Sequence, residues 1–116
     1  MTTVIIQQDK DFAYKGLVFW GHAGYARRSL FRRQTEKDVV CASISVLVMT
    51  TLNSLEVLAN EPMDMTSNED EGFIRYIFQE PLHEKSSFLI DSMIFGLEQI
   101  KQEYGEQYLQ IIFEEV

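Results

Sequence analysis

The sequence predicts one α/β (α+β) domain, a mainly antiparallel sheet of about five strands with two helices packed on one face. Three observations predict it: short segments typical of strands, two long segments with apolar residues at helical spacing, and their order ββαββαβ. The chain has 116 residues, of which 46% are hydrophobic and 24% charged. That length and composition suit a single core, so residues 1–116 are expected to form one domain.

The first half of the chain predicts two strands and a long helix. Residues 3–8 and 12–20 are expected to be strands joined by a polar turn. Their inward side chains are expected to be Val4, Ile6, Leu17 and Phe19. A helix is expected over residues 38–59, with Asp38 as its N-cap. Its apolar stripes would contain Val40, Ile44, Leu47, Leu55 and Leu58.

The second half predicts a hairpin, a helix and a last strand. Residues 63–67 and 73–79 are expected to pair around a turn that contains Gly72. A second helix is expected to start at Ser86 or Ser87 and to stop at Gly105. Residues 108–113 complete the sheet.

The charge is unevenly distributed along a chain whose net charge is −8. Residues 1–60 carry seven Lys/Arg against five Asp/Glu, a net of +2, and residues 61–116 carry three against thirteen, a net of −10. Such an acidic chain is not expected to bind nucleic acid through phosphate contacts. A basic protein partner matches the acidic half better.

The compartment is expected to be the cytoplasm. A single cysteine cannot form an internal disulfide, which fits a reducing environment. No uninterrupted apolar run is long enough to span a bilayer, and the start of the chain lacks the pattern of a signal peptide, so no membrane association is expected.

Cys41 is the only cysteine, and it follows His22 by nineteen residues. If Asp38 caps the helix, Cys41 lies in its first turn, where free backbone N–H groups favour a thiolate and could bind an oxyanion. His22, between Gly21 and Gly24, could serve as general base and then as general acid. The pattern indicates nucleophilic thiol chemistry, although a lone cysteine in an apolar stretch is also commonly a buried small side chain.

Two motifs resemble a known family. Residues 21–26 read GHAGYA and residues 38–47 read DVVCASISVL. Together they resemble the ribosomal-processing cysteine proteases (Prp), small bacterial enzymes with GHAGYA, a short spacer, and an aspartate three residues before Cys-Ala. The likeness continues at residues 53–56 and 95–104, and so covers nearly the whole chain.

The resemblance implies a cysteine endopeptidase that removes the N-terminal extension of one bacterial large-subunit ribosomal protein, the twenty-seventh, during ribosome assembly. It implies Cys41 as nucleophile and His22 as general base. Asp38 matches the family's aspartate, and Ser45 matches its serine one helical turn after the cysteine. A homodimer packed through its helices is also implied, and no cofactor.

The spacer departs from the family pattern, in which it is usually a few residues resembling Glu-Tyr-Gly. Residues 27–37 here are eleven residues, RRSLFRRQTEK, with five basic side chains. The segment could be a basic flap that grips a peptide, with Phe31 as an apolar contact, or a solvated insertion.

Several neighbouring residues have two possible roles. Asp38 could orient the histidine or only cap the helix. Gly21 and Gly24 could be hinges of a substrate-binding loop or plain turn residues. Ser45 could contact the thiol or substrate, or ease helix packing, and Tyr25 could line the site or anchor its loop.

Other chemistry is poorly supported by the sequence. His83 is expected to be an exposed histidine in a polar loop. His22, Cys41 and His83 lack the spacing of zinc ligands, so no metal site is expected.

Two alternatives to the protease remain open. A non-catalytic dimeric binding protein for a ribosomal protein or assembly intermediate, with Cys41 inert, would have the same fold. The enzyme predicts rapid native alkylation with a pH midpoint well below ~8.5, and the binding protein predicts slow alkylation until unfolding. A redox sensor using the same thiol is a third, weaker possibility.

Overall fold

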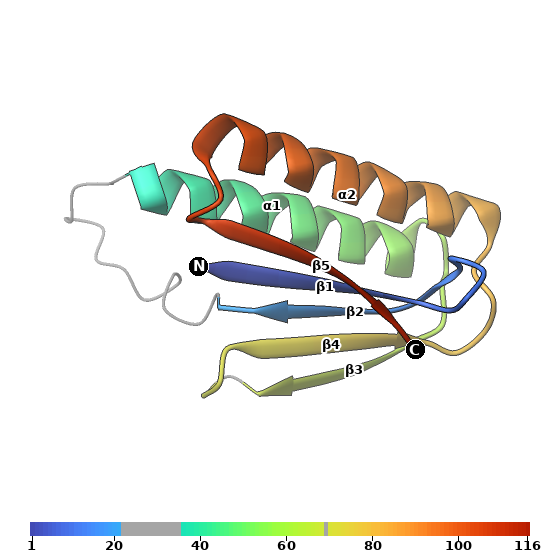
Figure 1. The fold of residues 1–116 in the computed structure, drawn as a ribbon. Coiled ribbons are helices and arrows are strands. Elements are labelled where there is room, and N and C mark those ends of the chain that lie inside the picture. The colour runs from blue at the N-terminus through green and yellow to red at the C-terminus, as the bar shows by residue number, and fades with distance from the viewer. Residues whose placement is uncertain (22–35, 69) are drawn as a thin grey trace.

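Figure 1 shows the computed structural model of the chain, in which residues 1–21, 36–68 and 70–116 are described. The elements are β1 (Thr2–Gln8), β2 (Tyr14–Trp20), α1 (Glu36–Val57), β3 (Met63–Asn68), β4 (Phe73–Phe78), α2 (Glu84–Tyr104) and β5 (Leu109–Glu115). The predicted order ββαββαβ is therefore confirmed.

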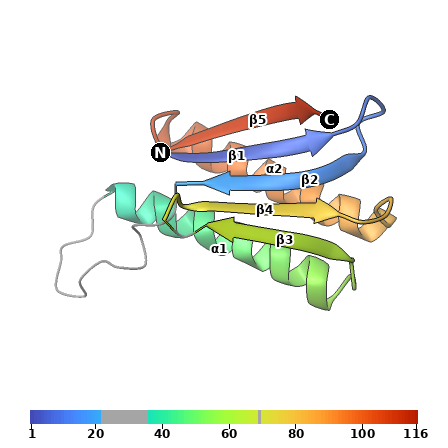
Figure 2. The same cartoon turned by 90° about the horizontal axis from the view of Figure 1, so that it is seen from below.

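The five strands form one sheet in the order β3-β4-β2-β1-β5. Neighbouring strands are antiparallel except β1 and β5, which are parallel. Both helices lie on the same face of this sheet, as Figures 1 and 2 show. The sheet is thus mainly antiparallel with its helices on one side, as predicted.

The core lies between the sheet and the helix pair. The four predicted inward side chains of β1 and β2 are at most 2% exposed, which confirms that they lie in the core. They meet buried residues of both helices and of β5 in one cluster. From the helices this cluster takes Val40, Ile44, Val48, Leu52, Leu55, Ile90, Met93, Ile94 and Leu97.

Helix α1 is apolar along most of its length. In the described part of the chain it is the one helix whose length and composition would allow it to cross a bilayer. Core helices of soluble proteins have the same composition, and here Ile44 and Leu55 are fully buried in the core. The apolar character of α1 is therefore accounted for in part by its packing against the sheet and against α2.

The predicted boundaries of α1 are wrong at both ends. The helix begins at Glu36, so Asp38 lies inside its first turn and is not the N-cap. Acidic residues are favoured in the first turn for their interaction with the helix dipole, as well as at the cap, and the sequence pattern does not separate the two positions. Leu58 lies beyond the last helical residue and is 71% exposed, so it is not a core residue.

The boundaries of α2 are right at one end only. It begins at Glu84, with His83 in the N-cap position, and not at either serine. It ends at Gly105 as predicted, where a φ of 107° suits glycine and the backbone N–H donates to the carbonyl O of Lys101 at 2.8 Å.

Four element ends meet at one end of the molecule. The pairing of Thr2 with Leu109 places the start of β1 beside the start of β5, and the pairing of Thr3 with Trp20 adds the end of β2. The first turn of α1 lies at the same end (Figure 1). The start of α1, which contains Cys41, therefore lies at the same end of the molecule as Gly21, the last described residue before His22.

Candidate active site

Cys41 is a free, half-buried cysteine and the sixth residue of α1. Val40 and Ile44 on either side are fully buried, so they anchor this part of the helix and leave the thiol at the edge of the core. The free N–H groups of a helix belong to its first four residues, and its dipole acts mainly within the first turn. The predicted first-turn position is therefore wrong, and the helix N-terminus favours a thiolate at Cys41 less than the sequence suggested.

Asp38 lies one helical turn before Cys41 and is 3% exposed. A buried carboxylate is unfavourable unless donors compensate its charge. Its burial on the same side of the helix as Cys41 fits a role inside the site better than a role at the helix end. Capping is excluded by its place in the helix, and the orienting role remains a proposal.

Ser45 follows Cys41 by four residues, so the two side chains lie one above the other on the helix. Both are half-buried. This is the relation that the sequence predicted. The structure thus brings Asp38, Cys41 and Ser45 onto neighbouring turns of one helix.

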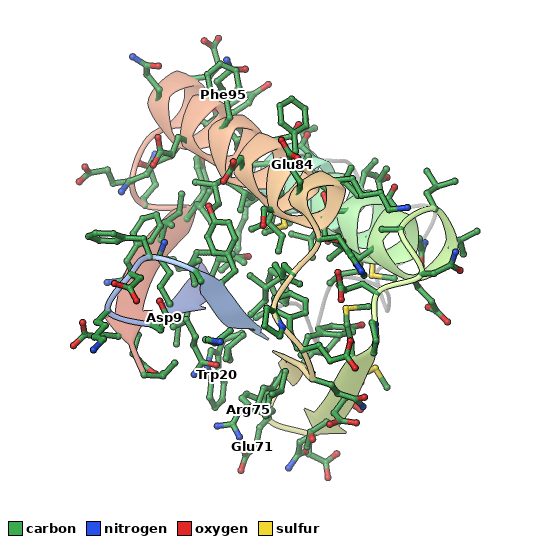
Figure 3. The ribbon with its side chains drawn as sticks, turned by 90° about the vertical axis from the view of Figure 1, so that its right-hand side faces the viewer. Asp9, Trp20, Glu71, Arg75, Glu84 and Phe95 are labelled. Atoms are coloured by element: carbon green, nitrogen blue, oxygen red, sulfur yellow. The ribbon has the colours of Figure 1, made fainter. Side chains whose placement is uncertain are left out.

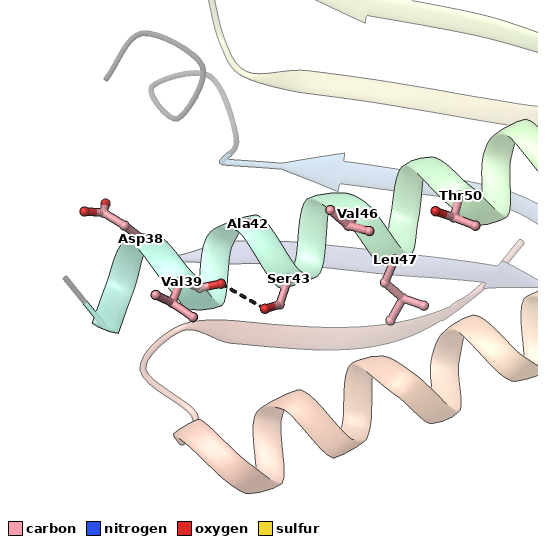
Figure 4. Close-up of a pocket in the computed structure, with 7 residues that line it drawn as sticks. All are labelled: Asp38, Val39, Ala42, Ser43, Val46, Leu47 and Thr50. Carbon is pink, nitrogen blue, oxygen red and sulfur yellow. Dashed lines mark hydrogen bonds between the residues drawn. The ribbon is translucent and has the colours of Figure 1, made fainter. Parts of the chain in front are cut away.

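A shallow groove on α1 does not contain the thiol. Figure 4 shows its lining, which is Asp38, Val39, Ala42, Ser43, Val46, Leu47 and Thr50. The hydroxyl of Ser43 donates to the backbone O of Val39 at 2.9 Å, within the helix. The groove shares Asp38 with the candidate site but otherwise follows a different stripe of the helix.

Gly21 is the last described residue before His22, and its surroundings require glycine. Its φ is 96°, and a Cβ atom there would lie 2.5 Å from the carbonyl O of Met1. Its N–H donates to the carbonyl O of Gly72 at 3.0 Å. These contacts explain the glycine without a hinge.

Three of the predicted site residues, His22, Gly24 and Tyr25, lie outside the described residues, as does residue 31 with most of the basic segment. Of residues 27–37, Glu36 and Lys37 belong to α1.

Tyr108 is a residue at this end of α1 that the sequence analysis missed. Its hydroxyl donates to Oε2 of Glu36 at 2.8 Å. This hydrogen bond raises the pKa of Tyr108, as does burial, and the charge of the Cys41 thiolate adds to the rise. Tyr108 was predicted only as the first residue of the last strand, and the parallel pairing of β1 with β5 is what brings it to this end of the molecule.

His83 is exposed over 60% of its side chain, as predicted. It is nevertheless not isolated, because its Nδ1 lies 3.3 Å from Oε1 of Glu61, whose side chain is fully buried. Within residues 1–21, 36–68 and 70–116, no three His, Cys, Asp or Glu side chains cluster in a way that could hold a metal ion.

Comparison with known proteins identifies the family. Residues 1–109 match the family described as cysteine protease Prp. The chain belongs to this family. The match spans both motifs, so the resemblance read from the sequence is confirmed. Prp proteins are cysteine proteases, and the predicted class of protein is confirmed with it.

Curated Prp relatives are similar over nearly their whole length. The ribosomal processing cysteine protease Prp of Bacillus subtilis is 30% identical over 111 residues, covering 91% of this chain and 92% of the relative. The protein of the same name from Staphylococcus aureus is 22% identical over 106 residues, covering 91% and 93%.

Solved Prp structures have the same fold. The S. aureus protease with a substrate peptide superposes with a TM-score of 0.79 at 18% identity, over 98% of this chain and 100% of that chain. The same protease with a covalently linked product peptide gives 0.77 at 20% identity, with the same coverage. A Streptococcus mutans protein gives 0.79 at 21% identity over 100% and 99%.

Proposed function

We propose that this Prp protein is a cysteine endopeptidase in which the Cys41 thiolate is the nucleophile and His22 is the general base and acid. The observation that carries the proposal is the placement of Cys41. It is a free thiol at the edge of the core, near the N-terminal end of α1. Gly21, the residue before His22, follows the end of β2 at the same end of the molecule.

The reaction follows from these two groups. His22 takes the thiol proton, and the thiolate sulfur attacks the scissile carbonyl carbon, whose oxygen becomes an oxyanion. The oxyanion collapses, the C–N bond breaks, and the imidazolium protonates the leaving amine. Water, deprotonated by the imidazole, then attacks the thioester and releases the carboxylate product and the thiol. The cycle needs no cofactor.

Asp38 is proposed to orient the His22 imidazole, as the third group does in nucleophile–base–orienter sites. Its position supports this, because it is a buried carboxylate on the same side of α1 as Cys41, one turn before it. Ser45, one turn beyond Cys41, is proposed to contact the substrate or the thiol.

The substrate is proposed to be the N-terminal extension of a large-subunit ribosomal protein in the bacterial cytoplasm. The relatives are named ribosomal processing proteases, and the S. aureus protein was solved with a substrate peptide. The strongly acidic second half of the chain suits a basic protein substrate and disfavours direct binding to nucleic acid.

The protein is proposed to act as a homodimer packed through its helices. Val46 on α1 and Phe95 on α2 are each 66% exposed, and Figure 3 shows Phe95 directed away from the sheet. Exposed apolar side chains of this size on a helical layer favour an interface.

The test is cleavage of a peptide that spans the extension and its junction, with products identified by mass spectrometry. Wild type, Cys41→Ala and His22→Ala are compared, with Ser43→Ala as a matched control whose side chain bonds within α1. One cut by wild type and Ser43→Ala, and none by the other two, is expected. Cleavage that survives in Cys41→Ala would exclude the mechanism.

Failure of wild type to cut has two distinguishable meanings. If Cys41 is also unreactive toward iodoacetamide in the native protein, the non-catalytic binding protein is the better description. If Cys41 is reactive, the peptidase has a different substrate sequence.

A further inference from the structure

The first turn of α1 places negative charge close to the proposed nucleophile. The described titratable groups there are Glu36, Lys37 and Asp38, five, four and three residues before Cys41. Carboxylates at this position are favourable for the helix dipole. They are unfavourable for a thiolate, because a neighbouring like charge disfavours the charged form of a group.

Glu36 is held by a group from a distant part of the chain. Its Oε2 accepts a hydrogen bond of 2.8 Å from the hydroxyl of Tyr108, 72 residues away. The backbone of Tyr108 is itself fixed, since its carbonyl O accepts from the N–H of Thr2 at 3.0 Å and the next residue, Leu109, is fully buried. The donor therefore comes from the turn immediately before β5 and reaches the helix that carries the thiol.

The hydrogen bond to Glu36 also affects the titration of Tyr108 itself. The hydrogen bond to Glu36 and burial raise the pKa of Tyr108, and the charge of the Cys41 thiolate adds to the effect. The phenol consequently remains protonated, and remains a donor, when the thiolate forms. A donor bound to a carboxylate offsets part of its charge and fixes its direction.

We propose that Tyr108 is a positioning residue for the reaction, whose hydroxyl holds the Glu36 carboxylate so that its charge does not oppose the Cys41 thiolate. This inference rests on the proposed function, because it matters only if the thiolate is the nucleophile. Tyr108 acts through Glu36 and the charge near the thiol, and it is not itself a reacting group.

The test is the pH dependence of iodoacetamide alkylation of Cys41 in the full chain. Tyr108→Phe removes only the hydroxyl, and its alkylation midpoint is expected at higher pH, with alkylation at pH 7 about two- to fivefold slower. Glu36→Gln in the same background removes the charge and is expected to restore the wild-type midpoint. A merely structural role of the hydroxyl would not be rescued in this way.

A second phenol–carboxylate pair supplies the matched control. The hydroxyl of Tyr14 donates to Oδ1 of Asp91 at 2.5 Å, and Tyr14 lies at the start of β2, the other end of the sheet from the site. Tyr14→Phe is expected to leave the midpoint unchanged. In peptide cleavage assays, Tyr108→Phe is expected to lower kcat and to leave KM unchanged.

The outcomes separate this inference from the proposed function. A reactive wild-type thiol with an unchanged Tyr108→Phe midpoint overturns the inference alone. A raised midpoint that Glu36→Gln fails to restore also overturns it, in favour of a structural role. A wild-type thiol that alkylates only on unfolding overturns the proposed function and this inference with it.

Discussion

The backbone N–H of Gly21 donates to the carbonyl O of Gly72 at 3.0 Å, and so joins the end of β2 to the turn between β3 and β4. On its other side, Gly21 packs against the carbonyl of Met1 at the start of the chain. The residue before the proposed general base is therefore held from two directions. The described structure supports a fixed approach to His22 more than a hinge at this glycine.

Gly21→Ala is expected to destabilise the protein and to reduce cleavage. A side chain at φ 96° is strained by about 1–3 kcal/mol, and its Cβ would also meet the carbonyl O of Met1 at 2.5 Å. Urea unfolding gives the stability change, and peptide cleavage under native conditions gives the activity.

Gly105→Ala is the matched control. Gly105 has a similar φ of 107°, but the atoms that a Cβ would meet belong to the flexible side chain of Gln107, which can move away. We expect the backbone strain alone here, with a smaller loss of stability than in Gly21→Ala. Equal losses in the two variants would show that the contact with Met1 contributes nothing.

His22→Ala should change the reactivity of Cys41 as well as abolish cleavage. Because Cys41 lies in the second turn of α1, the helix dipole supplies little help, and an imidazolium must favour the thiolate. Native alkylation is expected to have a midpoint well below ~8.5 in wild type and to return to about 8.5 in His22→Ala. An unchanged midpoint would mean that His22 does not interact with the thiol.

Ser45→Ala is expected to reduce kcat/KM, by about tenfold if its hydroxyl makes one hydrogen bond in the site. Ser43→Ala is the control, because Ser43 lies two residues away on the groove side and bonds to Val39. Steady-state cleavage of the same peptide compares them. If both serines have the same small effect, Ser45 has only a packing role.

The titration of Tyr14 is expected to lower the free energy of unfolding in alkaline solution. Burial and the hydrogen bond to Asp91 raise the pKa of Tyr14 in the folded state. Its protonated form therefore adds stability that is fully present below pH ~10, the unfolded value, and is lost as the pH rises further. Urea unfolding between pH 8 and 11 should show a decline of at most about 1.4 kcal/mol per pH unit from this group.

Tyr14→Phe should make that decline shallower without removing it. The pKa values of Tyr76 and Tyr108 are also raised, the first mainly by burial and the second mainly by Glu36, so they contribute with the same sign. An identical pH slope in Tyr14→Phe and wild type would show that the hydroxyl of Tyr14 does not titrate with unfolding.

Local signals in the sequence predicted much of the fold. The strand-like segment at the start of the chain predicted Val4 and Ile6 as inward residues of β1, and a glycine able to adopt positive φ marked the end of α2. Asp38 shows the limit of such signals, because an acidic residue suits both the cap and the first turn. The position of Cys41 relative to the helix start was wrong for the same reason.

Contacts between distant segments could not be read in this way. Tyr108 meets Glu36 because β5 pairs in parallel with β1. The residues around position 108 carry no local pattern from which that pairing could be predicted. The contact of His83 with Glu61 likewise depends on how α2 begins beside the end of α1. The family resemblance supplied the candidate nucleophile and base, but it did not point to these neighbours.

The helical layer should hold two copies of the chain together. Val46→Asp and Phe95→Asp each place a charge on side chains that are 66% exposed on α1 and α2, and burying that charge in an interface is unfavourable. Sedimentation is expected to give twice the chain mass of 13.5 kDa for wild type and the single mass for these variants. Met65→Asp is the control, since Met65 is a similar apolar residue, 60% exposed, on the edge strand β3. Dissociation by Met65→Asp, with the helix variants still dimeric, would place the interface at that edge of the sheet instead.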